Sequence, residues 1–184
     1  MQSTNSEYGW RRVVHGGIDG FSSKIMFLKT SNNNRVSTLL HCFLETVHVY
    51  GLPHCVRSDR GGENVDVARF VLDRGPDRKS YITGKSVNNQ RIERLWRHLW
   101  CSVIHIHICY AAFRHLEDIG PLDPNNEVHI TCLHFVMLPR LNWHLKFFAD
   151  TWDRHPLSSE GYRSPQQLWV AGLLVAPKQL PEAV

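Results

Sequence analysis

The stretch Cys55-Val56-Arg57-Ser58-Asp59-Arg60-Gly61-Gly62-Glu63-Asn64 decides the fold class. It begins as a short apolar run after Pro53, reaches the carboxylate of Asp59, turns at two glycines and opens an apolar pattern of helical spacing. This succession predicts a buried strand, a turn and a helix, with Asp59 at the carboxyl end of the strand. Ligands and reacting groups gather at that edge of open α/β sheets, so Asp59 is a candidate metal ligand or general base. The alternative is that Asp59 only shapes the turn, as Asp commonly does.

A second candidate carboxylate, Glu93, belongs to a predicted helix. The segment Asn88-Asn89-Gln90-Arg91-Ile92-Glu93-Arg94-Leu95-Trp96-Arg97 has a polar start and then apolar residues at helical spacing. Those apolar positions are Ile92, Leu95, Trp96, Leu99 and Val103. Glu93 lies at the flank of this stripe, so its carboxylate can lean toward the sheet edge that carries Asp59. Two carboxylates that meet there can bind Mg²⁺ or Mn²⁺, and such ions promote reactions at phosphodiesters.

Positive charge is concentrated beside both carboxylates. The net charge of the chain is only +4, so the placement of the charges is more informative than their sum. The flanking arginines are Arg57, Arg60, Arg91, Arg94 and Arg97. Clustered arginines favour contact with a phosphate backbone, which makes DNA a candidate partner. The alternative is a solvated helix face on which Glu93 pairs with Arg97.

Taken together, the two segments resemble the catalytic core of retroviral and transposon-type integrases. The resemblance is carried by Ser58-Asp59-x-Gly61-x-Glu63 and by Asn89-Gln90-Arg91-Ile92-Glu93-Arg94-Leu95-Trp96. It is strongest to the transposon-derived integrase core domain proteins of animal genomes. Two further segments fit the same order, the hairpin-like Gly16 to Ser22 and a closing segment from His155 to Trp169. The resemblance extends from about Trp10 to Trp169.

The resemblance implies an α/β, RNase H-like mixed sheet flanked by helices, with a helical C-terminal half. In the family, three carboxylates hold two Mg²⁺ ions for hydrolysis at a DNA end and for strand transfer, and Asp59 and Glu93 match two of the three. The family's first Asp lies on a strand before the hairpin, whereas residues 1–9 contain no Asp. The resemblance therefore implies a sheet that lacks its first strand, and a DNA-integration or transposition enzyme that has become defective. Its implied partners are DNA and, as a further option, other copies of the chain.

A non-enzymatic alternative stays open, in which the chain is a protein-interaction module on an RNase H-like scaffold. In that case the two carboxylates are inherited, and the helical second half contacts protein partners. Affinity for DNA that falls steeply with salt would separate a DNA binder from such a module.

The order of elements predicts one core domain over 10–170, between a disordered polar tail at 1–9 and a loose tail at 171–184. Strands over 10–18 and 22–28 are expected to form a hairpin, because Asp19-Gly20 between apolar runs is a strong turn signal. Asp19 is accordingly assigned to the turn, with a role as the third metal ligand as the alternative. A helix, the strand that ends at Asp59 and a further helix follow, as expected of an α/β protein.

Composition favours an intracellular location. The chain has five cysteines, an odd number, and no Cys-x-x-Cys motif, so a reducing compartment is expected. Its longest apolar run is interrupted by histidines and falls short of the roughly 20 residues that cross a bilayer. We therefore expect an intracellular protein without a membrane segment, with the nucleus among the compartments that this allows.

Overall fold

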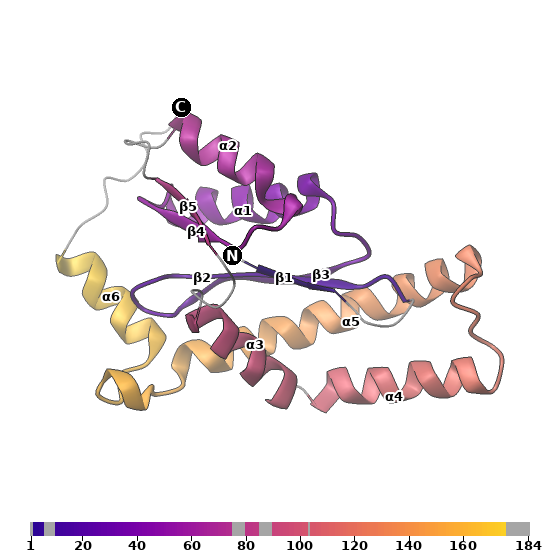
Figure 1. Ribbon diagram of the computed structural model, residues 1–184. Helices are drawn as coiled ribbons and strands as arrows, with labels where there is room; N and C mark the ends of the chain where they lie inside the picture. The colour runs from indigo at the N-terminus through magenta and orange to yellow at the C-terminus, as the bar shows by residue number, and fades with distance from the viewer. Residues whose placement is uncertain (1, 6–9, 75–79, 85–89, 103, 176–184) are drawn as a thin grey trace.

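The chain folds into a mixed α/β arrangement in which a small sheet separates two groups of helices (Figure 1). The computed structural model describes residues 2–5, 10–74, 80–84, 90–102 and 104–175. The strands are β1 (Gln2–Asn5), β2 (Val13–Ile18), β3 (Ile25–Ser31), β4 (Val56–Ser58) and β5 (Tyr81–Thr83). The helices are α1 (Val36–Tyr50), η1 (Gly62–Asn64), α2 (Val65–Arg74), α3 (Gln90–Ser102), α4 (Ile104–Asp118), α5 (Glu127–Arg154), η3 (Ser158–Glu160) and α6 (Pro165–Val175). The predicted α/β class and helical C-terminal half are confirmed.

The first sheet contains a strand that the sequence did not predict. Strand β1 pairs antiparallel with β2, with Gln2 opposite Gly16 and Asn5 opposite Val13. The expectation of a missing first strand is therefore wrong, and so is a disordered tail for residues 2–5; residues 6–9 lie outside the described ranges. Gln2-Ser3-Thr4-Asn5 has no apolar alternation to indicate a strand. Its strand geometry follows from backbone pairing with β2, which a local pattern does not reveal.

The hairpin forms with a longer turn than expected. Strands β2 and β3 pair antiparallel, and the Asp19 backbone N–H donates to the Lys24 carbonyl at 2.8 Å. Within the turn, Asp19 Oδ2 accepts hydrogen bonds from Phe21 N at 3.1 Å, Ser22 N at 2.7 Å and Ser22 Oγ at 2.8 Å. The turn role of Asp19 is confirmed. Because the turn extends to Lys24, β3 begins at Ile25 and not at 22.

A second sheet carries the segment that ends at Asp59. Strands β4 and β5 pair in parallel, with Val56 opposite Tyr81 and Ser58 opposite Thr83. A single mixed sheet was expected, whereas the described strands divide into a three-stranded and a two-stranded sheet. Helices α1 and α2 cover β4 through a buried cluster, which consists of Leu39, Phe43, Val56, Val67 and Val71. Phe27 of β3 packs against the same cluster, so α1 links the two sheets.

Helices α3 and α5 cover the opposite face of the three-stranded sheet (Figure 1). Their core cluster contains Ile25, Ile92, Leu95, Trp96, Leu99, Leu141, Leu145 and Trp152. The predicted apolar stripe of α3 is thus confirmed, except that Val103 lies outside the described residues. Gly16 of β2 allows α3 to pack closely against the sheet, because a Cβ atom at this position would lie only 2.8 Å from Trp96 Cη2.

The last helix extends into the segment that was expected to be a loose tail. Helix α6 continues to Val175, so the expected loose tail does not apply to residues 171–175, and the residues after it lie outside the described part. Among the helices described, none is both long enough and apolar enough to span a membrane. The limits of the core domain at 10 and 170 stay a prediction.

Candidate nucleic-acid interface

Asp59 follows β4 directly, at the predicted strand end. The carboxylate is half-buried, and its Oδ1 accepts two hydrogen bonds. One comes from Asn64 Nδ2 at 3.0 Å and the other from Gly61 N at 3.4 Å. Asp59 therefore shapes the turn into η1, as the alternative reading of the sequence proposed. Since both hydrogen bonds go to Oδ1, this role does not by itself use the second carboxylate oxygen.

A hydrogen-bonded layer beneath Asp59 was missed by the sequence analysis. Ser58 Oγ and the Tyr81 hydroxyl lie 2.7 Å apart, and the Tyr81 hydroxyl also donates to the Asn64 carbonyl at 3.4 Å. Burial raises the pKa of Tyr81, and the nearby charges of Asp59 and Glu63 raise it further, against the opposing effect of the Ser58 hydrogen bond. The phenol is thus held neutral at physiological pH. Only the parallel pairing of β4 with β5 brings these groups together, and no local motif signals that pairing.

Glu93 lies in the first turn of α3 and is half-buried at the edge of the apolar stripe. The structure thereby places it where the helical pattern predicted. Six ion pairs join described residues, and none of them joins Glu93 to Arg97, so the alternative pairing on the helix face is not observed.

Arg91 has a defined structural role at the start of α3. Its Nη1 donates to the Phe21 carbonyl at 2.9 Å and to Ser23 Oγ at 3.1 Å, and its Nη2 lies 3.8 Å from Glu160 Oε1. The guanidinium group therefore connects α3 to the hairpin turn and to η3. The other predicted phosphate contacts, Arg57, Arg60, Arg94 and Arg97, are exposed.

Among the described residues, the two carboxylates are not joined by a third metal-binding side chain. In the described part of the chain, no group of three His, Cys, Asp or Glu side chains is placed to hold a metal ion. The Asp19 carboxylate accepts hydrogen bonds within its own turn, and the described strand β1 contains no acidic residue. The pairing of Asp59 with Glu93 as metal ligands stays a prediction.

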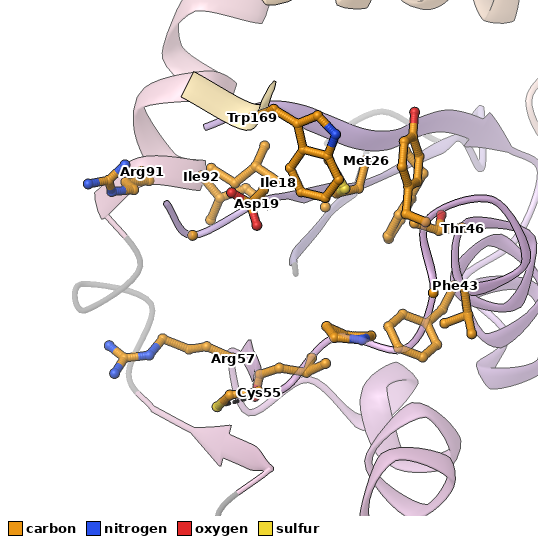
Figure 2. A pocket seen from close by; sticks show the side chains of 18 of the residues that line it. Ile18, Asp19, Met26, Phe43, Thr46, Cys55, Arg57, Arg91, Ile92 and Trp169 are labelled. Atoms are coloured by element: carbon orange, nitrogen blue, oxygen red, sulfur yellow. Dashed lines mark hydrogen bonds between the residues drawn. The ribbon is translucent and has the colours of Figure 1, made fainter. Parts of the chain in front are cut away.

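A cavity of about 460 Å³ lies between the segments that carry the two carboxylates (Figure 2). Val56 and Arg57 of β4 form part of its wall, and Gln90, Arg91 and Ile92 at the start of α3 form another part. The remaining wall comes from the hairpin, from the C-terminal half of α1 and the loop that joins it to β4, and from Trp169 of α6. Although these segments lie far apart in the sequence, the fold arranges them around one opening.

His15 is a buried titratable residue on β2, close to this region. Its Nε2 lies 2.9 Å from Ser31 Oγ and 3.3 Å from the Asn33 carbonyl oxygen. Burial lowers the pKa of His15, although the Asn33 hydrogen bond and the charge of Glu63 oppose this change. The folded protein therefore favours the neutral imidazole.

We expect acid to destabilise the protein through His15. Its folded pKa lies below the ordinary value of about 6.5, so the unfolded chain binds a proton that the folded chain resists. The contribution of His15 to the free energy of unfolding is complete above about pH 6.5. It decreases as the pH falls below that value, by at most about 1.4 kcal/mol per pH unit. Urea unfolding between pH 7.5 and 5 should give a shallower pH dependence for His15→Asn. Identical slopes for the two proteins would contradict this role.

Comparison with known proteins gives one family. A family model described as an integrase core domain matches residues 2–183. Among solved structures, the chain is similar to the catalytic core domain of the integrase of HTLV-2, solved in complex with magnesium in a trimeric form. That similarity has a TM-score of 0.48 at 15% sequence identity, over 91% of this chain and 91% of that chain. No curated protein matched the sequence.

Proposed function

The chain belongs to the integrase core domain family, and from this premise we propose that it is a DNA-binding domain derived from a transposon DNA-integration enzyme. The observation that carries the proposal is the set of exposed arginines around the two family carboxylates. Arg57 and Arg60 flank Asp59, and Arg94 and Arg97 follow Glu93 on α3. Because guanidinium groups pair well with phosphate oxygens, this surface suits a DNA backbone.

The same residues argue for a defective enzyme. Asp59 and Glu93 match two of the family's three carboxylates, but none of the residues of β1 is acidic. Since the described side chains gather no three-ligand group, a Mg²⁺ or Mn²⁺ ion at Asp59 and Glu93 would be held weakly. The role that we propose for this chain's own residues is DNA binding, in which the arginines hold and orient the phosphate backbone.

Fluorescence anisotropy with a labelled DNA duplex tests the proposal. A plot of log affinity against log salt concentration should be linear, with a slope of about −0.9 for each phosphate contacted. Combining Arg94→Gln with Arg97→Gln should weaken binding and reduce the magnitude of that slope by about 2.

The matched control combines Arg140→Gln with Arg154→Gln, which removes the same charge from exposed positions on α5. Its salt slope should remain that of the unmodified protein. Equal losses in both double variants would show only an effect of net charge. Absence of DNA binding at low salt would overturn the proposal.

One observation favours the alternative of a protein-interaction module. On α5, Phe135 is 82% exposed, and Trp143 and Phe147 are each 64% exposed. The rings of Trp143 and Phe147 are stacked, with centroids 6.2 Å apart. Exposed aromatic residues are enriched at protein interfaces, so another protein or a second copy of the chain would suit this face. Indifference to DNA at every salt concentration would favour this function over the first.

A further inference from the structure

The long helix α5 carries an exposed apolar stripe on the side opposite its buried face. On the buried face, Leu141 and Leu145 belong to the core cluster that α5 shares with Ile25 of β3. The stripe consists of apolar residues that share one side of the helix and are 49 to 82% exposed, namely Val128, Phe135, Val136, Trp143 and Phe147. At 1.5 Å per residue the stripe is about 28 Å long. A partner helix of about 18 residues would cover it.

The charged residues within this stripe are all positive. No Asp or Glu occurs between Val128 and Phe147, and the Arg and Lys residues of that span are Arg140 and Lys146, which are both exposed. At about 100° per residue, Arg140 and Lys146 lie on opposite flanks of Trp143. A partner that complements this surface has an apolar face with acidic residues along both of its edges.

We propose that this face of α5 binds an acidic amphipathic helix of another protein, with the apolar side on Trp143 and Phe147 and carboxylates at Arg140 and Lys146. The proposal rests on the alternative function of a protein-interaction module and names the class of its partner. Amphipathic helices dock on apolar surfaces through side chains at helical spacing. The stacked rings of Trp143 and Phe147 supply the aromatic anchor on which such interfaces depend.

Charge argues against two other occupants of this face. A second copy of the chain that packed about a two-fold axis at Trp143 would place Arg140 opposite Lys146 of the other copy, and facing like charges are unfavourable. A DNA duplex carries one negative charge per about 1.7 Å of its axis, so about 16 charges along the stripe would meet two cations. An acidic helix needs only a few carboxylates and covers the apolar residues as well.

Two designed peptides test the charge preference. Each is a fluorescein-labelled helix of about 18 residues with leucine at heptad positions a and d and alanine at most other positions. One peptide has glutamate at positions e and g, and the other has lysine there. Fluorescence anisotropy with the full chain should show that the glutamate peptide binds at least about tenfold more tightly at low salt. Added salt should decrease that ratio, because it depends on exposed charges.

Two double variants assign the binding to this face. Trp143→Ser with Phe147→Ser should weaken binding of the glutamate peptide at least about tenfold, because the aromatic anchor is lost. Arg140→Glu with Lys146→Glu should reverse the preference, so that the lysine peptide binds more tightly.

The matched control combines Val49→Ser on α1 with Leu72→Ser on α2. These apolar side chains are 68% and 48% exposed and lie outside the stripe, so both peptide affinities should stay unchanged. Thermal unfolding of every variant checks that the fold is intact.

Each outcome decides the proposal. Equal affinities for the two peptides, or a preference that Arg140→Glu with Lys146→Glu does not change, overturn it and leave the DNA-binding function standing. A dimer in sedimentation velocity that Trp143→Ser with Phe147→Ser abolishes identifies a second copy as the occupant and also overturns it. Loss of DNA binding in that same double variant assigns the face to nucleic acid and overturns it as well. The expected peptide preference without any DNA binding supports the proposal and leaves the protein-interaction module as the function.

Discussion

We expect the purified protein to fail to nick or join DNA in Mg²⁺ or Mn²⁺ while still binding DNA at low salt. Two-metal chemistry needs ligands on both ions, and under the proposed assignment Asp59 and Glu93 would supply only part of that set. Loss of a single electrostatic contact to a transition state commonly costs about 100-fold or more in rate, so a site with two of the family's three carboxylates should have no detectable activity. Nicking of supercoiled plasmid, followed on agarose gels over hours, provides the measurement. Asp59→Asn serves as the matched background, since it should give the same rate as the unmodified chain.

Introducing an acid on β1 provides the converse experiment. The variants Ser3→Asp, Thr4→Asp and Asn5→Asp place a carboxylate at successive positions of the strand that pairs with β2. One of them should raise metal-dependent nicking at least about tenfold above background, and adding Asp59→Asn should abolish the gain. The opposite finding would be nicking by the unmodified chain that disappears in Asp19→Asn. That result would make the hairpin residue a metal ligand and our assignment of it to the turn wrong.

Replacing Asp153 with Ala should have the largest effect on stability. Asp153 Oδ2 forms an ion pair with Lys24 Nζ, and the two side chains are only 13% and 11% exposed. Its Oδ1 also accepts a hydrogen bond from Ile25 N at 3.0 Å. Asp153→Ala leaves the Lys24 charge buried without its partner, which typically costs about 3 to 5 kcal/mol. Urea unfolding at pH 7 measures the loss.

The control for this substitution lies one turn earlier on α5. Asp150 is exposed, so Asp150→Ala should change the free energy of unfolding by less than about 0.5 kcal/mol. Replacing both partners, in Lys24→Met with Asp153→Leu, should recover much of the loss, because no buried charge then remains. A cost below about 1 kcal/mol for Asp153→Ala would show that water reaches Lys24 easily.

The features that the sequence predicted correctly are those with a local signal. The apolar stripe of α3 repeats at helical spacing, and Ile92, Leu95 and Trp96 are buried as expected. The Asp19-Gly20 turn and the position of Asp59 after a strand depend on neighbouring residues in the same way. Such signals also made the family recognisable, because Asp59 and Glu93 each lie within a compact motif.

What the sequence did not predict depends on contacts between distant segments. Strand β1 is polar and is held by its neighbour β2, so its own residues do not mark it as a strand. The parallel pairing of β4 with β5 and the cavity wall formed by Trp169 require the complete fold. Arg91 was expected to contact phosphate, but its contacts with Phe21 and Ser23 depend on how α3 meets the hairpin.

The contacts of Arg91 have a thermodynamic consequence for the C-terminal part of the protein. Arg91 lines the cavity, and its guanidinium group lies beside Glu160 of η3, the 3₁₀ turn that precedes α6. A phosphate that draws Arg91 toward itself would compete with Glu160, so phosphate binding at Arg91 and attachment of η3 would oppose each other. Such linkage is reciprocal: whatever loosens η3 increases the affinity of Arg91 for the anion by the same factor. Glu160→Gln should therefore tighten phosphate binding at Arg91, although Glu160 is not part of the cavity wall.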